Sequence, residues 1–228
     1  MKTALLTSSE TFGRYVFHPG KWLVTWADGK IISNHKIHSL VFPTTVMLPP
    51  GVEDSGTTIV KKAIEIKADV IITFGLASEI KGFRIERSGY NWIENLKYCQ
   101  PYENYHPIDL NHSDKEKVEI DLSWWNLDLI KKLFKEKGLP LDPNISDDPG
   151  FFSCNSWIYR TVLAIKKYNL TVPYIFIHTA CTEETIELIP DFPRDKKMVI
   201  PKESTLKALE IFLRSYIVPT QKSGSICT

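Results

Sequence analysis

Short apolar runs alternate with amphipathic stretches in the first part of this chain. Residues 3–7 and 69–75 are almost continuously apolar, which predicts strands buried on both faces. Between them, residues 54–67 carry apolar side chains at helical spacing, and residues 42–48 predict a further strand that ends at Pro49. A buried strand, a helix and a second buried strand predict a βαβ unit with parallel strands.

The same alternation continues towards the C-terminus. Apolar periodicity predicts a helix from an N-cap at Ser123 to a stop at Gly138, a helix from Cys154 to about residue 168, and a closing helix over 204–218. Between the last two, residues 174–178 predict a third buried strand. The fold expected over residues 1–228 is therefore a single α/β domain, a three-layer α/β/α sandwich with a mostly parallel, mixed central sheet.

Four segments are predicted less directly. A helix is expected over 21–27 after a Pro19-Gly20 break, and a more exposed strand or hairpin over 82–92. Residues 94–117 have little periodicity and predict a long ordered loop, while residues 219–228 are expected to form a flexible C-terminal tail.

Composition and charge narrow the class of function. The chain has 228 residues, 43% of them hydrophobic, and a net charge of +1. A balanced charge argues against nucleic acid or an anionic membrane as partner, and favours small neutral ligands or peptides. The first nine residues hold too short an apolar stretch for a signal peptide, so we expect a cytoplasmic protein.

The cysteines do not form a framework. Cys99, Cys154, Cys181 and Cys227 are widely spaced and include no Cys-x-x-Cys pair, which predicts free thiols and no zinc knuckle. A metal site made by His178, Cys181 and Glu183 is disfavoured, because its spacing needs a helix where a strand is ending. We therefore expect neither a metal nor a cofactor.

Cys154 is the most informative of these cysteines, because it lies where a loop is expected to become a helix. Unpaired backbone N–H groups and the positive end of the helix dipole favour thiolate over thiol at such a position. The residue is accordingly a candidate nucleophile. The alternative is a small buried apolar residue, since free cysteine is among the most buried residue types.

A thiol nucleophile needs a base within hydrogen-bonding reach and a third group to orient that base. His178 is placed at the end of a predicted strand, at the sheet edge where the Cys154 helix should also begin. Glu86 is one of the acidic residues near a strand edge. Taken alone, His178 could equally cap a strand, and Glu86 could form a surface ion pair with Arg87.

Three motifs in order resemble the pyroglutamyl peptidase I family, also called pyrrolidone-carboxylate peptidases, which are cysteine peptidases of an α/β/α fold. The family's run Gly-x-Phe-x-Cys-Asn-x-x-x-Tyr is matched at every fixed position by Gly150, Phe152, Cys154, Asn155 and Tyr159. Its Glu-Arg-x-x-x-Asn is matched by the segment 86–91, and its Phe-Ile-His by the segment 176–178. The resemblance extends over nearly the whole chain.

This resemblance implies that Cys154 is the nucleophile, His178 the general base and later acid, and Glu86 the group that orients the imidazole. The expected activity is removal of an N-terminal pyroglutamyl group from peptides with a blocked N-terminus, through a thioester intermediate. A homodimer or homotetramer is implied as well. The implied substrate-binding residues are Ser9, Phe12, His18, Gly75, Leu76, Phe152 and Asn155.

The substrate pocket departs from the family pattern. Ser9 replaces the first of two phenylalanines in the N-terminal motif, His18 replaces an asparagine, and Leu76 replaces a glutamine. These changes leave two alternatives open. One is a family member with the same triad that acts on a different N-terminal cyclic or acyl amide, and the other is a non-catalytic peptide or metabolite binding protein on the same fold.

Overall fold

A six-stranded mixed sheet forms the centre of the molecule in the computed structural model, which describes residues 1–11, 17–44, 53–94, 105–187 and 199–217. The strand order is β2-β3-β1-β4-β10-β5. The four inner strands are parallel and the two edge strands run antiparallel to their neighbours. Their bounds are β1 Lys2–Ser9, β2 Ile31–Ile32, β3 His35–Phe42, β4 Val70–Leu76, β5 Phe83–Glu86 and β10 Tyr174–Thr179.

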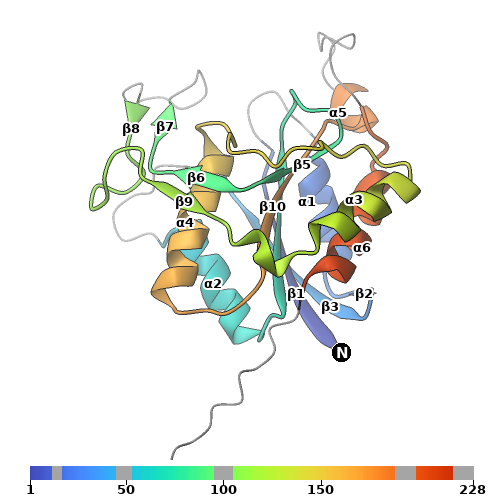
Figure 1. Cartoon of the computed structure of the whole chain (residues 1–228), viewed down its shortest axis with the longest axis horizontal. Coiled ribbons are helices and arrows are strands. Elements are labelled where there is room, and N and C mark those ends of the chain that lie inside the picture. The colour runs from blue at the N-terminus through green and yellow to red at the C-terminus, as the bar shows by residue number, and fades with distance from the viewer. Residues whose placement is uncertain (12–16, 45–52, 95–104, 188–198, 218–228) are drawn as a thin grey trace, which may run out of the picture.

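Helices cover both faces of this sheet (Figure 1). On one face lie α2 (Ser55–Glu65) and α4 (Ser153–Lys167), which pack against each other; on the other lie α1 (Pro19–Ala27), α3 (Leu127–Glu136) and α6 (Glu203–Ser215). Each face of the sheet contributes to its own large apolar cluster. The predicted three-layer α/β/α architecture with a mostly parallel, mixed sheet is confirmed.

Short elements lie outside the main sheet. The three-residue strands β6 (Ser88–Tyr90) and β9 (Lys117–Glu119) pair with each other, as do β7 (Ile93–Glu94) and β8 (Tyr105–His106). A 3₁₀ turn, η1, spans Leu122–Trp124, and the short helix α5 spans Glu183–Glu187. The expectation of an unbroken loop over residues 94–117 is therefore wrong where β8 and β9 form.

The sequence pattern predicted one strand of the main sheet at the wrong residues. The strand is β3, over His35–Phe42, and part of the predicted segment 42–48 lies outside the described residues. Its N-terminal half alternates buried and partly exposed positions, and a tight turn at Ser33 and Asn34, both with positive φ, connects it to β2. A half-exposed strand with polar side chains contains no continuous apolar run, so the search for such runs did not find β3.

Helix boundaries explain two further corrections. Pro19 and Gly20 form the first turn of α1 and are not a break before it, because proline suits the first helical position, and His18 is the N-cap. Asn126, and not Ser123, caps α3; its side chain accepts a hydrogen bond from the Leu129 amide at 3.0 Å. The predicted tail 219–228 lies outside the described residues.

Candidate active site

Cys154 lies in the first turn of α4, whose N-cap is Phe152. A phenylalanine side chain cannot accept a hydrogen bond, so the N-cap leaves the first-turn amides of α4 without the side-chain acceptor that serine or aspartate would provide. The thiol is partly exposed, in contrast to the buried Cys181. The helix start thus presents an accessible sulfur beside uncapped backbone donors.

His178 lies near the end of β10, and its ring is almost completely buried. On β10, its register partners are Gly75 on β4 and Arg84 on β5. The ring of Phe176 packs edge-on against the imidazole, with centroids 5.1 Å apart. A Cβ at Gly75 would lie 2.9 Å from Cδ2 of His178, so only glycine leaves room for the ring in this position.

Glu86, at the end of β5, is fully buried and holds the other side of the imidazole. Its Oε1 lies 2.6 Å from Nδ1 of His178. A carboxylate only accepts, so Nδ1 carries the proton and Nε2 is the ring nitrogen left to interact with Cys154, whose charge and hydrogen bonding raise the pKa of His178. The structure therefore brings together Cys154, His178 and Glu86, three residues that are widely separated in the sequence, and the surface ion pair considered for Glu86 is excluded.

The electrostatics of these groups are coupled. Burial by itself would lower the pKa of His178, but the charge of Cys154, its hydrogen bond and the Glu86 carboxylate together raise that pKa to about 9. Burial would raise the pKa of Glu86, yet the hydrogen bond and charge of His178, with Ser146 and Arg84, lower it. Protonated His178 is thus favoured beside Glu86 and Cys154.

Arg84 is a neighbour of the triad that sequence reasoning missed. Its Nε donates to Oε1 of Glu86 at 2.6 Å, the oxygen that also faces His178. The signal was present in the i,i+2 spacing, which places Arg84 and Glu86 on one face of the same strand. The strand or hairpin expected over residues 82–92 allowed this pairing, but the contacts of Arg84 with Glu86 and Asp148 emerge only from the tertiary structure.

An ion pair fixes the loop before α4. Asp147 pairs with Arg87, which keeps the pKa of the aspartate below its usual range, together with the hydroxyl of Ser88. The Tyr90 hydroxyl donates to the Asp147 carbonyl at 2.9 Å. These contacts tie the segment that leads into Cys154 to β6 and the residues next to Glu86.

Asn155 supports the same region from inside α4. The side chain is fully buried; its Oδ1 accepts from the Tyr90 amide at 2.7 Å, and its Nδ2 donates to the carbonyls of Tyr90 and Trp92 at 3.0 and 2.7 Å. Its amide is thus occupied by backbone groups. The side chain thereby holds residues 90–92 against the helix, and the substrate contact expected for Asn155 from the sequence stays a prediction.

His18 is buried at the start of α1. Its Nδ1 accepts the Lys21 amide at 3.2 Å, which leaves the proton on Nε2. Burial and, secondly, the charge of His178 lower the pKa of His18 to about 3, so the ring is neutral. A cavity of about 440 Å³ adjoins it, lined in part by Phe17 and Trp22.

The other predicted substrate-binding residues differ in their surroundings. Ser9 is buried at the end of β1, and Phe152 is partly buried beside Cys154. Leu76 packs against Cys181 and Ile186, so its side chain belongs to a small apolar cluster. Phe12 lies outside the described residues.

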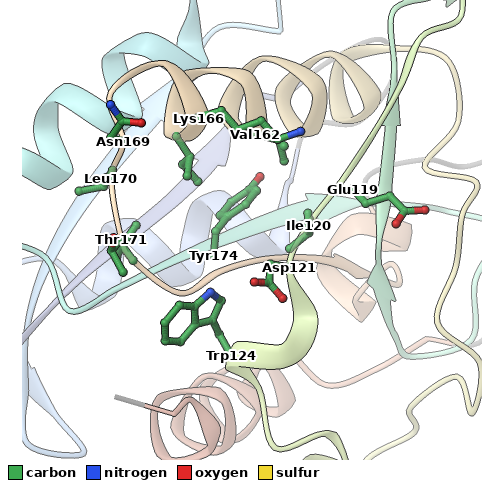
Figure 2. Close-up of a pocket in the computed structure, with 12 residues that line it drawn as sticks. Glu119, Ile120, Asp121, Trp124, Val162, Lys166, Asn169, Leu170, Thr171 and Tyr174 are labelled. Carbon is green, nitrogen blue, oxygen red and sulfur yellow. The ribbon is translucent and has the colours of Figure 1, made fainter. Parts of the chain in front are cut away.

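A larger cavity, of about 540 Å³, is lined by residues of β9, η1, α4 and β10 (Figure 2). Tyr174 and Trp124 line it, and Tyr174 begins the strand that ends near His178. Since the cavity contains none of the three triad residues, its size does not make it the reaction site. In the described part of the chain, His, Cys, Asp and Glu side chains do not gather into groups of three that could hold a metal ion.

Known proteins share the sequence pattern and the fold of this chain. The pyroglutamyl peptidase family matches the chain over residues 2–215. The chain belongs to this family. It is 26% identical over 227 residues to the pyrrolidone-carboxylate peptidase of Thermococcus litoralis, covering 94% of this chain and 92% of the relative, and 26% identical over 215 residues to that of Bacillus cereus strain B4264, covering 92% and 93%.

Solved structures show the same fold. The pyrrolidone carboxyl peptidase from Thermococcus litoralis superposes with a TM-score of 0.75 at 22% identity, covering 94% of this chain and 92% of that one. A structure of the enzyme from Pyrococcus furiosus gives a TM-score of 0.75 at 22% identity, covering 93% and 96%. The resemblance drawn from three motifs is confirmed, and it places the chain in a family of thiol proteases.

No helix of the described residues is long and apolar enough to cross a membrane.

Proposed function

We propose that this chain is a cysteine peptidase that removes an N-terminal pyroglutamyl group from peptides. The observation that carries the proposal is the placement of His178 between the Glu86 carboxylate, 2.6 Å from Nδ1, and the Cys154 thiol at the start of α4. Family membership over residues 2–215 supports the substrate class.

Each group has a defined task in the proposed reaction. His178 takes the proton of Cys154, and the thiolate attacks the carbonyl carbon of the pyroglutamyl amide. The carbonyl oxygen becomes an oxyanion, which the amides at the start of α4 stabilise through hydrogen bonds and the helix dipole. Glu86 holds the Nδ1–H tautomer and stabilises the imidazolium that forms.

The second half of the reaction regenerates the enzyme. Imidazolium at His178 donates its Nε2 proton to the leaving amine, the C–N bond breaks, and the acyl group remains on Cys154 as a thioester. Water, deprotonated by His178, then attacks the thioester carbonyl; the C–S bond breaks, pyroglutamate leaves, and the Cys154 sulfur departs as thiolate beside protonated His178. The raised pKa of His178 keeps the imidazole protonated until an amine must leave.

Two substituted positions bear on how a lactam would be recognised. His18 keeps a hydrogen-bond donor at Nε2 where the family pattern has asparagine. At Leu76 the side chain is turned into an apolar cluster, so a substrate contact there would have to be made by the backbone. Phe152, beside the nucleophile, supplies an apolar surface for the flat ring.

Hydrolysis of a fluorogenic pyroglutamyl amide tests the proposal. We expect activity in the wild type, its loss in Cys154→Ser, and its retention in Cys181→Ala, a matched control that removes a thiol packed in an apolar cluster. No activity in the wild type, or activity kept in Cys154→Ser, would overturn it.

The second candidate is the same chemistry on another N-terminal cyclic or acyl amide. Ser9 favours it, because a small hydroxyl side chain at the end of β1 replaces an aromatic wall of the family pattern. A panel of peptides blocked by pyroglutamyl, acetyl, formyl or larger cyclic groups separates the two candidates. The pyroglutamyl peptide is expected to have the highest kcat/KM, and a different preferred block would favour the second candidate.

The homodimer or homotetramer implied by the family is testable by light scattering.

A further inference from the structure

Arg84 and His178 share one carboxylate oxygen. Oε1 of Glu86 accepts from Arg84 Nε at 2.6 Å and lies 2.6 Å from His178 Nδ1. The carboxylate is fully buried, His178 is nearly so, and the Arg84 side chain keeps 23% of its surface exposed. A guanidinium therefore closes the outer side of the triad and contacts its acidic member directly.

The same guanidinium also reaches the loop that leads to the nucleophile. Its NH2 group donates to the carbonyl of Asp148 at 3.1 Å, six residues before Cys154. The planar fork of arginine can direct separate N–H groups to two acceptors, whereas a lysine ammonium acts as a single point charge. Arg84 thus connects β5, which carries Glu86, to the segment that enters α4.

We propose that Arg84 is a positioning residue of the triad: it fixes the Glu86 carboxylate towards His178 and couples that carboxylate to the loop before Cys154. The proposal rests on the proposed function of the triad. Without Arg84 the carboxylate keeps His178 and Ser146 but loses the charged donor to Oε1, so its orientation towards His178 is held less firmly. The imidazolium then has a less well placed partner, and less thiolate persists at neutral pH.

The groups that act on His178 come from three parts of the fold. Glu86 and Arg84 lie on β5, Cys154 lies on α4, and His18 precedes α1. Among these, Arg84 touches Glu86 and not the sulfur. Its effect on the thiol should therefore depend on the presence of the Glu86 charge.

The test is the rate of alkylation of Cys154 by iodoacetamide as a function of pH, which needs no substrate. Arg84→Met is expected to slow alkylation at pH 7 by about tenfold or more, the effect of losing a hydrogen bond to a charged group. Its alkaline transition should shift to lower pH. Arg84→Lys should be intermediate, and Arg214→Met, which removes an exposed arginine on α6, should react as the wild type.

A double-mutant comparison separates positioning from a general structural effect. In a Glu86→Gln background, Arg84→Met should slow alkylation much less than it does in the wild type. An equal loss in both backgrounds, or unchanged rate and pH dependence in Arg84→Met, would overturn the proposal. If Arg84→Met fails to fold by circular dichroism, Arg84→Lys carries the test, and a wild-type rate in that variant overturns it.

The alkylation experiment can overturn the role of Arg84 without overturning the proposed function, and the reverse is also possible. A chain that hydrolyses no pyroglutamyl amide but shows the expected alkylation pattern would lose the proposed function and keep the role of Arg84. Hydrolysis with no dependence of alkylation on Arg84 would have the opposite consequence.

Discussion

Gly75 packs so closely against His178 that a single added carbon would collide with the imidazole: a Cβ at Gly75 would lie 2.9 Å from Cδ2 of His178 and 2.8 Å from the Phe176 ring. The two residues are register partners on adjacent parallel strands. Because Gly75 has no side chain, the imidazole of His178 can occupy this space. Neither β4 nor β10 can move to admit a larger residue without disturbing the sheet.

Gly75→Ala should accordingly impair catalysis more than binding. Displacement of the imidazole is expected to lower kcat by about 10²-fold, since a shift of about 1 Å in a catalytic group has an effect of that size. Overpacking should also reduce the free energy of unfolding by about 1–3 kcal/mol. Steady-state kinetics and urea unfolding measure the two effects, and an unchanged kcat would show that the ring tolerates the methyl group.

Glu86→Gln keeps an acceptor for Nδ1–H of His178 but removes the charge. The imidazolium loses a stabilising anion, so the alkaline limb of the kcat/KM profile should move down from about 9 towards the ordinary histidine value. Activity at neutral pH should fall by about 10²- to 10⁴-fold. A profile that keeps its alkaline limb in Glu86→Gln would argue that Glu86 does not act on His178.

The raised pKa of His178 also predicts a contribution to stability. A folded-state pKa of about 9, above the unfolded value of 6.5, stabilises the native state fully below pH 6.5, and this stabilisation is lost as the pH rises through 9. The difference in unfolding free energy between the wild type and His178→Gln should therefore shrink between those pH values. A difference that grows over this interval would contradict the assigned direction, and NMR titration of the His178 ring gives an independent check.

Asn155→Ala should reduce stability before it affects substrate preference. Its loss would remove the acceptor of the Tyr90 amide and one donor to each of the carbonyls of Tyr90 and Trp92, while the Tyr90 carbonyl keeps the Trp92 amide at 2.8 Å. Each unmet buried group costs about 1–3 kcal/mol, so a large loss of unfolding free energy is expected. Asn155→Asp, which retains the acceptor for Tyr90, serves as the matched variant. A normal stability with a raised KM would instead favour the substrate contact expected for this residue from the sequence.

The main sheet could be predicted where its strands are buried on both faces. β1, β4 and β10 are continuous apolar runs, and the resulting parallel edge was enough to bring His178 near the Cys154 helix. β3 could not be found in this way, because its polar positions are half exposed and its identity depends on pairing with β1.

The three residues of the candidate triad could be predicted because each lies in a recognisable sequence motif. Cys154, Glu86 and His178 carry recognisable local contexts, whereas the role of Arg84 depends on a strand face and on a carbonyl 64 residues away. The amide of Asn155 likewise finds its partners only after β6 and α4 pack together. Such contacts arise from tertiary structure and have no local periodicity.

An affinity label tests the central claim most directly: a pyroglutamyl chloromethyl ketone, with its acetyl counterpart as control. The Cys154 thiolate should displace chloride and form a thioether, so intact-mass and peptide mapping are expected to find the pyroglutamyl adduct on Cys154 alone, with the acetyl reagent much slower. No adduct in the wild type, or an adduct on Cys181 or another residue in place of Cys154, would contradict the account.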